Sequence, residues 1–170
     1  EGVFDLQKEL CLPMFAQRIA VISSETAAGY GDFCNQLETN DYGLYFHVEL
    51  FPAIMQGDSV EQSIINALNQ INSREEDFDS VVIIRGGGAT ADLSGFDTLN
   101  LAENVANFPL PIITGIGHER DESILDMVSF QRVKTPTAVA AYLIDYLAST
   151  LMRVENAQVA IVDGVKKALE

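Results

Sequence analysis

The stretch Ser80-Val81-Val82-Ile83-Ile84-Arg85-Gly86-Gly87-Gly88 decides the fold. Four of its first five residues are apolar and β-branched, and an arginine with three glycines ends the run abruptly. A short apolar run closed by such a turn is typical of a strand buried on both faces in a parallel sheet. We therefore predict a strand over 80–84 whose carboxyl end opens on a glycine-rich loop.

The alternation of strands and helices continues on both sides of this stretch. We predict further strands over 18–24, 44–51 and 110–116, and helices over 30–37, 59–71, 99–106 and 122–128. In residues 44–51, Leu44, Phe46, Val48 and Leu50 share one face, and His47 lies on the wetter face. The pattern predicts an α/β fold, a Rossmann-like parallel sheet with helices on both faces, in the strand order 2-1-3-4.

The last segment follows a different period. Thr135 and Pro136 form a helix start, a threonine cap followed by proline at the first helical position. A heptad then runs through Ala140, Ile144, Leu147, Leu151, Val154, Gln158, Ile161, Val165 and Ala168. It favours a long helix that begins a coiled coil, although Gly164 weakens it and a long core-covering helix remains the alternative. We expect Leu147→Lys with Leu151→Lys to abolish helix association and leave the body folded.

Length and composition indicate about one domain without a membrane span. The chain has 170 residues, about one domain, which we divide into a catalytic domain over 1–134 and a long helix over 135–170. It begins with Glu1, so we expect a fragment or a processed chain. No run of 18 apolar residues is present, so we expect no membrane span. Cys11 and Cys34 form no motif, which favours two reduced thiols in a cytoplasmic protein.

The charge argues against nucleic acid as a partner of the whole surface. Lys and Arg number 10 and Asp and Glu number 25, which gives a net charge of −15. A protein that binds DNA by itself usually carries a basic face to neutralise phosphates. Any DNA contact must therefore come from a small cluster of basic groups or from another domain.

Polar residues gather at the predicted carboxyl ends of the strands, where ligands bind in doubly wound sheets. Ser24 and Asp32 follow the first strand, Arg85 and the glycines follow the third, and His118 and Asp121 follow the fourth. The loop amides and Arg85 could bind a phosphate, and Asp121 could orient His118. Each has a plainer interpretation: a sharp turn for the glycines, a helix N-cap for Asp121, a backbone-bonded loop histidine for His118. Asp32 would then be a surface acid in the first turn of a helix.

Three blocks together resemble the exonuclease VII large subunit family. They are Arg85–Asp97 (RGGGATADLSGFD), Pro111–Asp121 (PIITGIGHERD) and Lys134–Ala140 (KTPTAVA), and their order covers nearly the whole chain. The sequence departs from the usual family pattern at Ala89, at Asp97-Thr98 and in the turn before Asp32. None of these departures removes a candidate catalytic group.

The resemblance implies hydrolysis of single-stranded DNA from both ends to oligonucleotides with 5′-phosphates. It implies Asp32, Arg85, His118 and Asp121 as catalytic residues, and we expect Ser24, Gly86, Gly87 and Gly88 to bind phosphate. It also implies an N-terminal OB-fold and a further C-terminal region, both absent here, which would bind DNA and several copies of a small subunit.

The resemblance further implies that no cofactor is strictly required. A divalent metal could bind without being essential, and we assign no metal ligands. Two other interpretations stay open at this stage. One is a non-catalytic Rossmann-like module that binds a phosphate or nucleotide, and the other is an architectural domain that positions DNA for a site elsewhere.

Overall fold

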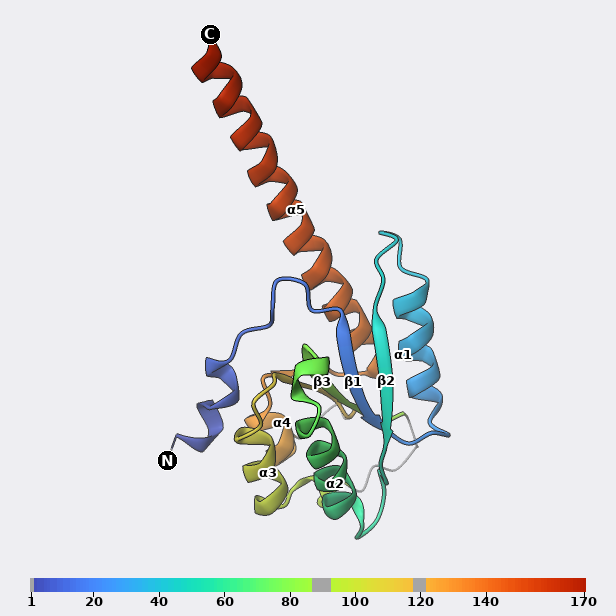
Figure 1. Cartoon of the computed structure of the whole chain (residues 1–170). Helices are drawn as coiled ribbons and strands as arrows, with labels where there is room; N and C mark the ends of the chain where they lie inside the picture. The colour runs from blue at the N-terminus through green and yellow to red at the C-terminus, as the bar shows by residue number, and fades with distance from the viewer. Residues whose placement is uncertain (1, 87–92, 118–121) are drawn as a thin grey trace.

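A five-stranded parallel sheet forms the centre of the protein (Figure 1). The structure is a computed structural model that describes residues 2–86, 93–117 and 122–170. The strands are β1 (Arg18–Ser23), β2 (His47–Pro52), β3 (Ser80–Ile84), β4 (Ile112–Gly115) and β5 (Gln131–Arg132). Their order is β2-β1-β3-β4-β5, so the predicted order is confirmed and a short edge strand is added.

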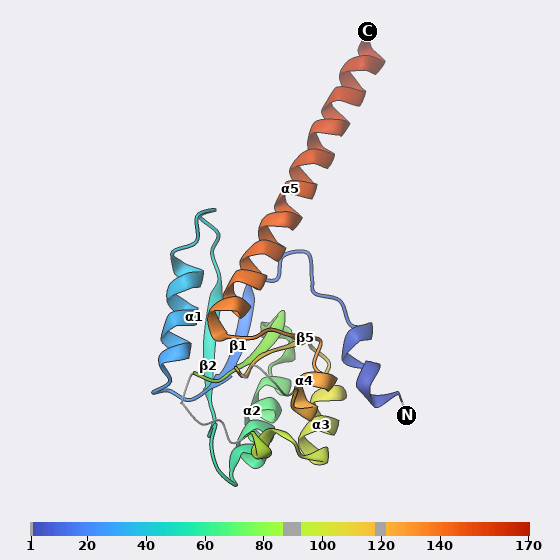
Figure 2. The same cartoon turned by 180° about the vertical axis from the view of Figure 1, so that it is seen from behind.

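Helices cover both faces of the sheet, which confirms the predicted α/β class (Figures 1 and 2). One face carries α2 (Val60–Asn72), α3 (Leu99–Ala106) and α4 (Ile124–Val128); the other carries α1 (Ala28–Glu38) and the first half of α5 (Pro136–Leu169). Short 3-10 turns lie at Val3–Asp5, Gln7–Glu9, Glu75–Asp77 and Ser94–Phe96. Alternate residues of β1 and β3 enter the two cores, as expected of strands buried on both faces.

The predicted strand over 80–84 and helix over 99–106 have the bounds that the sequence indicated. Strand β2 begins at His47 rather than at residue 44, because its neighbour β1 begins opposite it, at Arg18. The predicted inner face is confirmed, since Leu44, Phe46, Val48 and Leu50 all pack against the core that contains α1. His47 is exposed.

Two helix starts differ from the prediction. Helix α1 begins at Ala28, so Asp32 lies in its second turn and the assignment to the first turn was wrong. Helix α4 begins at Ile124, because the Ser123 side chain accepts from the amide of Asp126 and caps the helix. The expected start at Glu122 and the interpretation of Asp121 as the N-cap were therefore wrong.

Helix α5 confirms the predicted long helix and its cap. Its 34 residues extend about 50 Å at 1.5 Å per residue, and Thr135 accepts from the amide of Ala138. The inner and outer halves of the heptad differ in burial. Ala140, Ile144 and Leu147 are buried against the body, Leu151 and Val154 are half-buried, and every residue from Glu155 onward is exposed. The outer half of the helix projects away from the body (Figure 1). The expectation that Leu147→Lys would leave the body folded was wrong, because this side chain is 1% exposed.

None of the helices in the described ranges is both long enough and apolar enough to cross a membrane. Cys11 and Cys34 are free thiols, as predicted.

Helix α1 and the loop after β3 approach each other through two glycines. A Cβ atom on Gly29 would lie 2.7 Å from the Cα atom of Gly86, whereas one on Gly31 would meet nothing within 4 Å. We predict that Gly29→Ala destabilises the chain by about 1–3 kcal/mol, because backbone must move. Gly31→Ala is the matched control and should stabilise it by about 0.5–1 kcal/mol, since alanine favours a helix interior. Urea unfolding measures both, and equal effects of the two substitutions would contradict the close approach.

Candidate functional site

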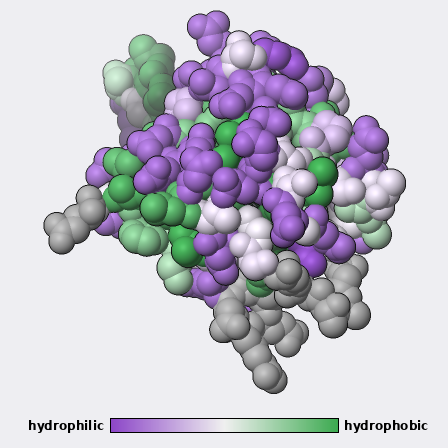
Figure 3. Space-filling view, turned by 90° about the horizontal axis from the view of Figure 1, so that it is seen from below, coloured by the Kyte–Doolittle hydropathy of each residue, from purple (hydrophilic) through white to green (hydrophobic). Residues whose placement is uncertain are grey.

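The carboxyl ends of the strands meet at one edge of the sheet, as predicted. The hydroxyl of Ser23 donates to the carbonyl of Ile84 at 2.9 Å, and the amide of Arg85 donates to the carbonyl of Gly115 at 3.2 Å. These bonds fix the ends of β1, β3 and β4 relative to one another. The face toward which the strands run is mostly hydrophilic, with separate hydrophobic areas (Figure 3).

A cavity of about 410 Å³ opens at this edge, beyond the ends of β1, β2 and β3. Its polar wall is formed by Ser24, Thr26, Arg85 and Gly86. The hydroxyls of Ser24 and Thr26 lie 3.2 Å apart, so one can donate to the other and both remain able to bind a further group. The structure therefore brings together Ser24, Arg85 and Gly86, which the sequence places at the carboxyl ends of two neighbouring strands.

Arg85 is the unusual group of this wall. It is 5% exposed, and its Nε atom has no hydrogen-bond partner. Within the described residues, nothing forms an ion pair with its guanidinium group. Burying an unpaired polar group costs about 1–3 kcal/mol, and an unpaired charge costs more. A site that accepts this cost is suited to an anion, which a guanidinium binds through two parallel hydrogen bonds.

The N-terminus of α1 adds to the positive potential at the cavity. Ala27, its N-cap residue, lines the cavity and has no side chain with which to cap the helix. The uncapped amides and the helix dipole favour an anion at this end. The contact of Gly29 with Gly86 holds this helix end directly beside the loop that follows Arg85.

The other predicted site residues either do not line the cavity or lie outside the described residues. Asp32 is exposed on α1 and does not line the cavity. His118, Asp121, Gly87 and Gly88 lie outside the described residues. A Cβ atom on Gly117, the residue before His118 in the sequence, would lie 3.9 Å from the carbonyl oxygen of Arg85, so Gly117 lies beside the candidate site.

Tyr30 lies in the first turn of α1, and burial raises its pKa to about 12. It stays neutral at physiological pH and is a poor general base. No cluster of three His, Cys, Asp or Glu side chains suited to a metal ion occurs within residues 2–86, 93–117 and 122–170. Because His118 and Asp121 fall outside these ranges, the metal requirement has to be measured.

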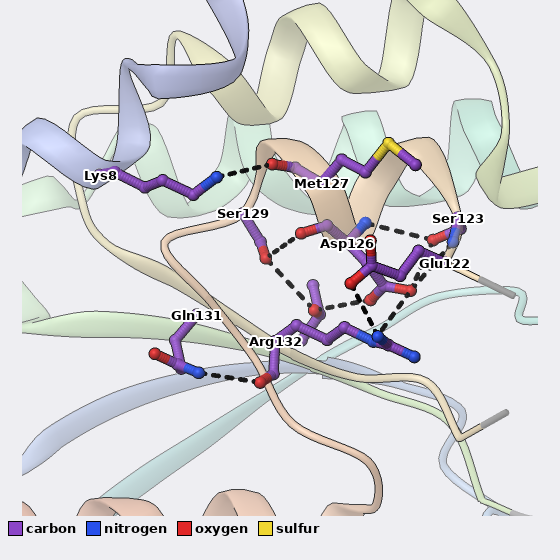
Figure 4. A network of polar contacts seen from close by, with 9 residues as sticks. Lys8, Glu122, Ser123, Asp126, Met127, Ser129, Gln131 and Arg132 are labelled. Atoms are coloured by element: carbon purple, nitrogen blue, oxygen red, sulfur yellow. Dashed lines mark hydrogen bonds and ion pairs between the residues drawn. The ribbon is translucent and has the colours of Figure 1, made fainter. Parts of the chain in front are cut away.

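A buried network of polar side chains surrounds α4, which follows His118 and Asp121 in the sequence (Figure 4). The carboxylate of Asp126 accepts from the hydroxyls of Thr114 at 2.8 Å and Ser123 at 2.9 Å. The Nε atom of Arg132 lies 4.0 Å from the same carboxylate, and its Nη1 atom donates to Glu122 at 2.7 Å. The network joins β4, α4 and β5 and fixes the start of α4 at Ser123. The capping pattern Ser123-x-x-Asp126 could have been found in the sequence.

We predict that Asp126→Asn destabilises the chain by about 1–3 kcal/mol, because an amide offers one acceptor oxygen to partners that now use two. Glu122→Gln is the control: its side chain is 48% exposed, so the change should be within about 1 kcal/mol. Denaturant midpoints compare the two. A stability loss for Glu122→Gln as large as that for Asp126→Asn would contradict the central position of Asp126.

Comparison with known proteins adds a family assignment to this geometry. The model of the family described as "Exonuclease VII, large subunit" matches residues 3–170. Proteins named exodeoxyribonuclease 7 large subunit from a Nostoc species and from Clostridium novyi are 39% and 35% identical to the chain, over 87% and 92% of its length. A third, from Lactobacillus helveticus, is 33% identical over 98% of it. The matched part covers 35%, 38% and 37% of these relatives, so the chain spans about a third of their length.

Proposed function

This chain belongs to the exonuclease VII large subunit family, and we propose that it is the catalytic part of an exodeoxyribonuclease. The reaction is hydrolysis of single-stranded DNA from both ends to oligonucleotides with 5′-phosphates. The observation that carries the proposal is Arg85, a buried guanidinium without an ion-pair partner among the described residues, in the wall of an open cavity. A phosphodiester supplies the missing anion.

In the proposed mechanism, Arg85, Ser24 and the amides of Gly86–Gly88 bind the scissile phosphate and stabilise the charge that develops on its oxygens. His118 activates water or gives a proton to the leaving 3′-oxygen, and Asp121 orients its imidazole. Asp32 acts as a second acid–base group or positions the water.

We propose that no cofactor is strictly required for this chemistry. The arginine itself neutralises the phosphate, a role that nucleases commonly assign to divalent metals. A divalent metal could still bind and accelerate the reaction without being essential.

We propose that the outer half of α5 binds further helices, including several copies of a small subunit. The exposed apolar side chains Ile161 and Val165 support this, because they lie four residues apart on one face of the helix and belong to the heptad, a pattern that favours packing on another helix. DNA affinity then comes largely from an OB-fold elsewhere in the full subunit. We place the complex in the cytoplasm, in keeping with the free thiols Cys11 and Cys34.

The proposal is tested with labelled single-stranded DNA and the complete enzyme, the full large subunit with its small subunit. Binding and hydrolysis are measured side by side for wild type and for variants at Arg85 and His118. A nuclease site predicts loss of hydrolysis for both variants, with binding largely kept by the rest of the complex. Full hydrolysis by both variants would instead favour a module that only binds phosphate.

This chain alone should bind single-stranded DNA very weakly. Its net charge of −15 repels a polyanion, and one buried arginine cannot offset this charge. Filter binding at low salt provides the measurement, with the complete enzyme as the positive control. Tight binding by the 170-residue chain would show that the main DNA contacts lie in this domain.

A further inference from the structure

The cavity beside Arg85 has a second wall, and its chemistry differs from that of the first. It is formed by Ala53, Ile54, Met55 and Gln56, which follow β2. An inorganic anion at Arg85 would be bound by the polar wall and would gain nothing from the apolar side chains Ala53, Ile54 and Met55 of the second wall. A ligand with an anionic part joined to a flat apolar part would use both.

This second wall is held firmly in place. Ala53 and Met55 are buried in the core beneath α2, and the amide of Ala53 donates to the carbonyl of Ser23 at 2.9 Å. The amide of Ile54 donates to the hydroxyl of Ser63 on α2 at 2.7 Å. Because its neighbours are fixed, the Ile54 side chain is presented at the cavity, where it is 51% exposed. It is therefore available to a ligand without any rearrangement of the loop.

We propose that the wall 53–56 is a nucleoside subsite, which binds the sugar and base of the nucleotide adjoining the phosphate at Arg85. This proposal rests on the proposed nuclease function. Ile54 packs against the base and sugar, and the Gln56 amide can hydrogen-bond to a base edge. A cavity of 410 Å³ lies within the usual range for sites of small ligands, and a single nucleotide is such a ligand.

The subsite also provides a physical basis for choosing single strands. A base within a duplex has both faces stacked on neighbours, so neither face can pack against Ile54. An unpaired strand can turn one base toward the wall while its phosphate reaches Arg85. Contact with protein side chains through a base face is general for single-strand binding and tolerates all four bases.

The test compares Ile54→Ala with wild type in the complete enzyme, on a short thymidine oligonucleotide and on a deoxyribose-phosphate strand of equal length without bases. Ile54→Ala should raise KM for the thymidine strand about 5- to 30-fold, by loss of up to three buried carbons, and leave kcat unchanged. On the strand without bases, wild type and Ile54→Ala should have the same KM. Ile54→Leu, which keeps the apolar volume, should behave as wild type.

Leu99→Ala is the matched control, because Leu99 is apolar and 71% exposed but does not line the cavity. It should change neither constant. An unchanged KM for Ile54→Ala, an equal rise on both strands, or a fall in kcat alone would overturn the subsite. The outcome is separate from that of the proposed function: a fully active Arg85→Ala enzyme overturns the nuclease site, whereas loss of activity there with a silent Ile54→Ala overturns only the subsite.

Discussion

Replacing Arg85 with alanine should lower the rate constant for hydrolysis of single-stranded DNA by about 100- to 1,000-fold. This is the effect of losing one strong charge-stabilising donor, about 3–4 kcal/mol of transition-state stabilisation. Among the described residues that line the cavity, Arg85 is the one with a positively charged side chain, so no other lining residue replaces its charge. Single-turnover hydrolysis by the complete enzyme gives the rate constant directly.

The fold should not suffer from the loss of this arginine. Arg85→Met keeps much of the side-chain volume and removes the unsatisfied Nε atom, so stability should be unchanged or higher by about 1–3 kcal/mol while activity falls. Arg74→Ala is the control for loss of a positive charge. It removes surface ion pairs to Glu49 and Asp77 far from the cavity and should leave hydrolysis unchanged. Equal losses for the two arginines would mean that charge, rather than position, explains the effect.

Replacing His118 with alanine should leave the complete enzyme almost inactive. A positioned acid–base group accelerates the reaction about 100- to 10,000-fold by transferring a proton. An added metal ion cannot take over this proton transfer. Added Mg²⁺ should therefore restore nothing. The rate constant of the variant is measured with and without Mg²⁺ at saturating DNA.

The chain offers a matched histidine for this experiment. His47 is exposed at the start of β2, whereas the cavity lies beyond the carboxyl ends of the strands. His47→Ala should therefore keep wild-type activity. Recovery of the His118→Ala enzyme in Mg²⁺ or Mn²⁺ would contradict the acid–base assignment. His118 would then act through a metal.

The strands and most helices of the fold could be predicted because each buries a periodic apolar pattern. The run Val81–Ile84 has no polar face, so a doubly covered parallel strand was the natural solution, and its bounds were correct. Strand β5 could not be predicted, because two residues carry no period and pair only through the position that β4 gives them. The start of α1 was placed too late because its N-cap residue is Ala27, which carries no capping side chain, and because Gly29 has a low helix propensity. Glycine occupies position 29 of this helix because Gly86 leaves no room for a larger residue.

The candidate site was partly accessible to the same reasoning. Ser24, Arg85 and Gly86 were collected from the rule that ligands bind beyond the carboxyl ends of parallel strands, and they do line one cavity. The rule could not find the second wall at Ile54, because side chains of loops are placed by packing rather than by a repeat. The heptad pattern also did not distinguish Leu147, which is buried against the body, from the half-buried Leu151.

Hydrolysis of single-stranded DNA by the wild-type complete enzyme in excess EDTA tests the central claim most directly. That claim is that side chains around the Arg85 cavity carry out the reaction without an essential metal. We predict that hydrolysis continues in EDTA and that Arg85→Ala lowers it by about 100- to 1,000-fold under the same conditions. Complete loss of wild-type activity in EDTA, restored by Mg²⁺ or Mn²⁺, would contradict the claim and make Asp32, His118 and Asp121 candidate metal ligands.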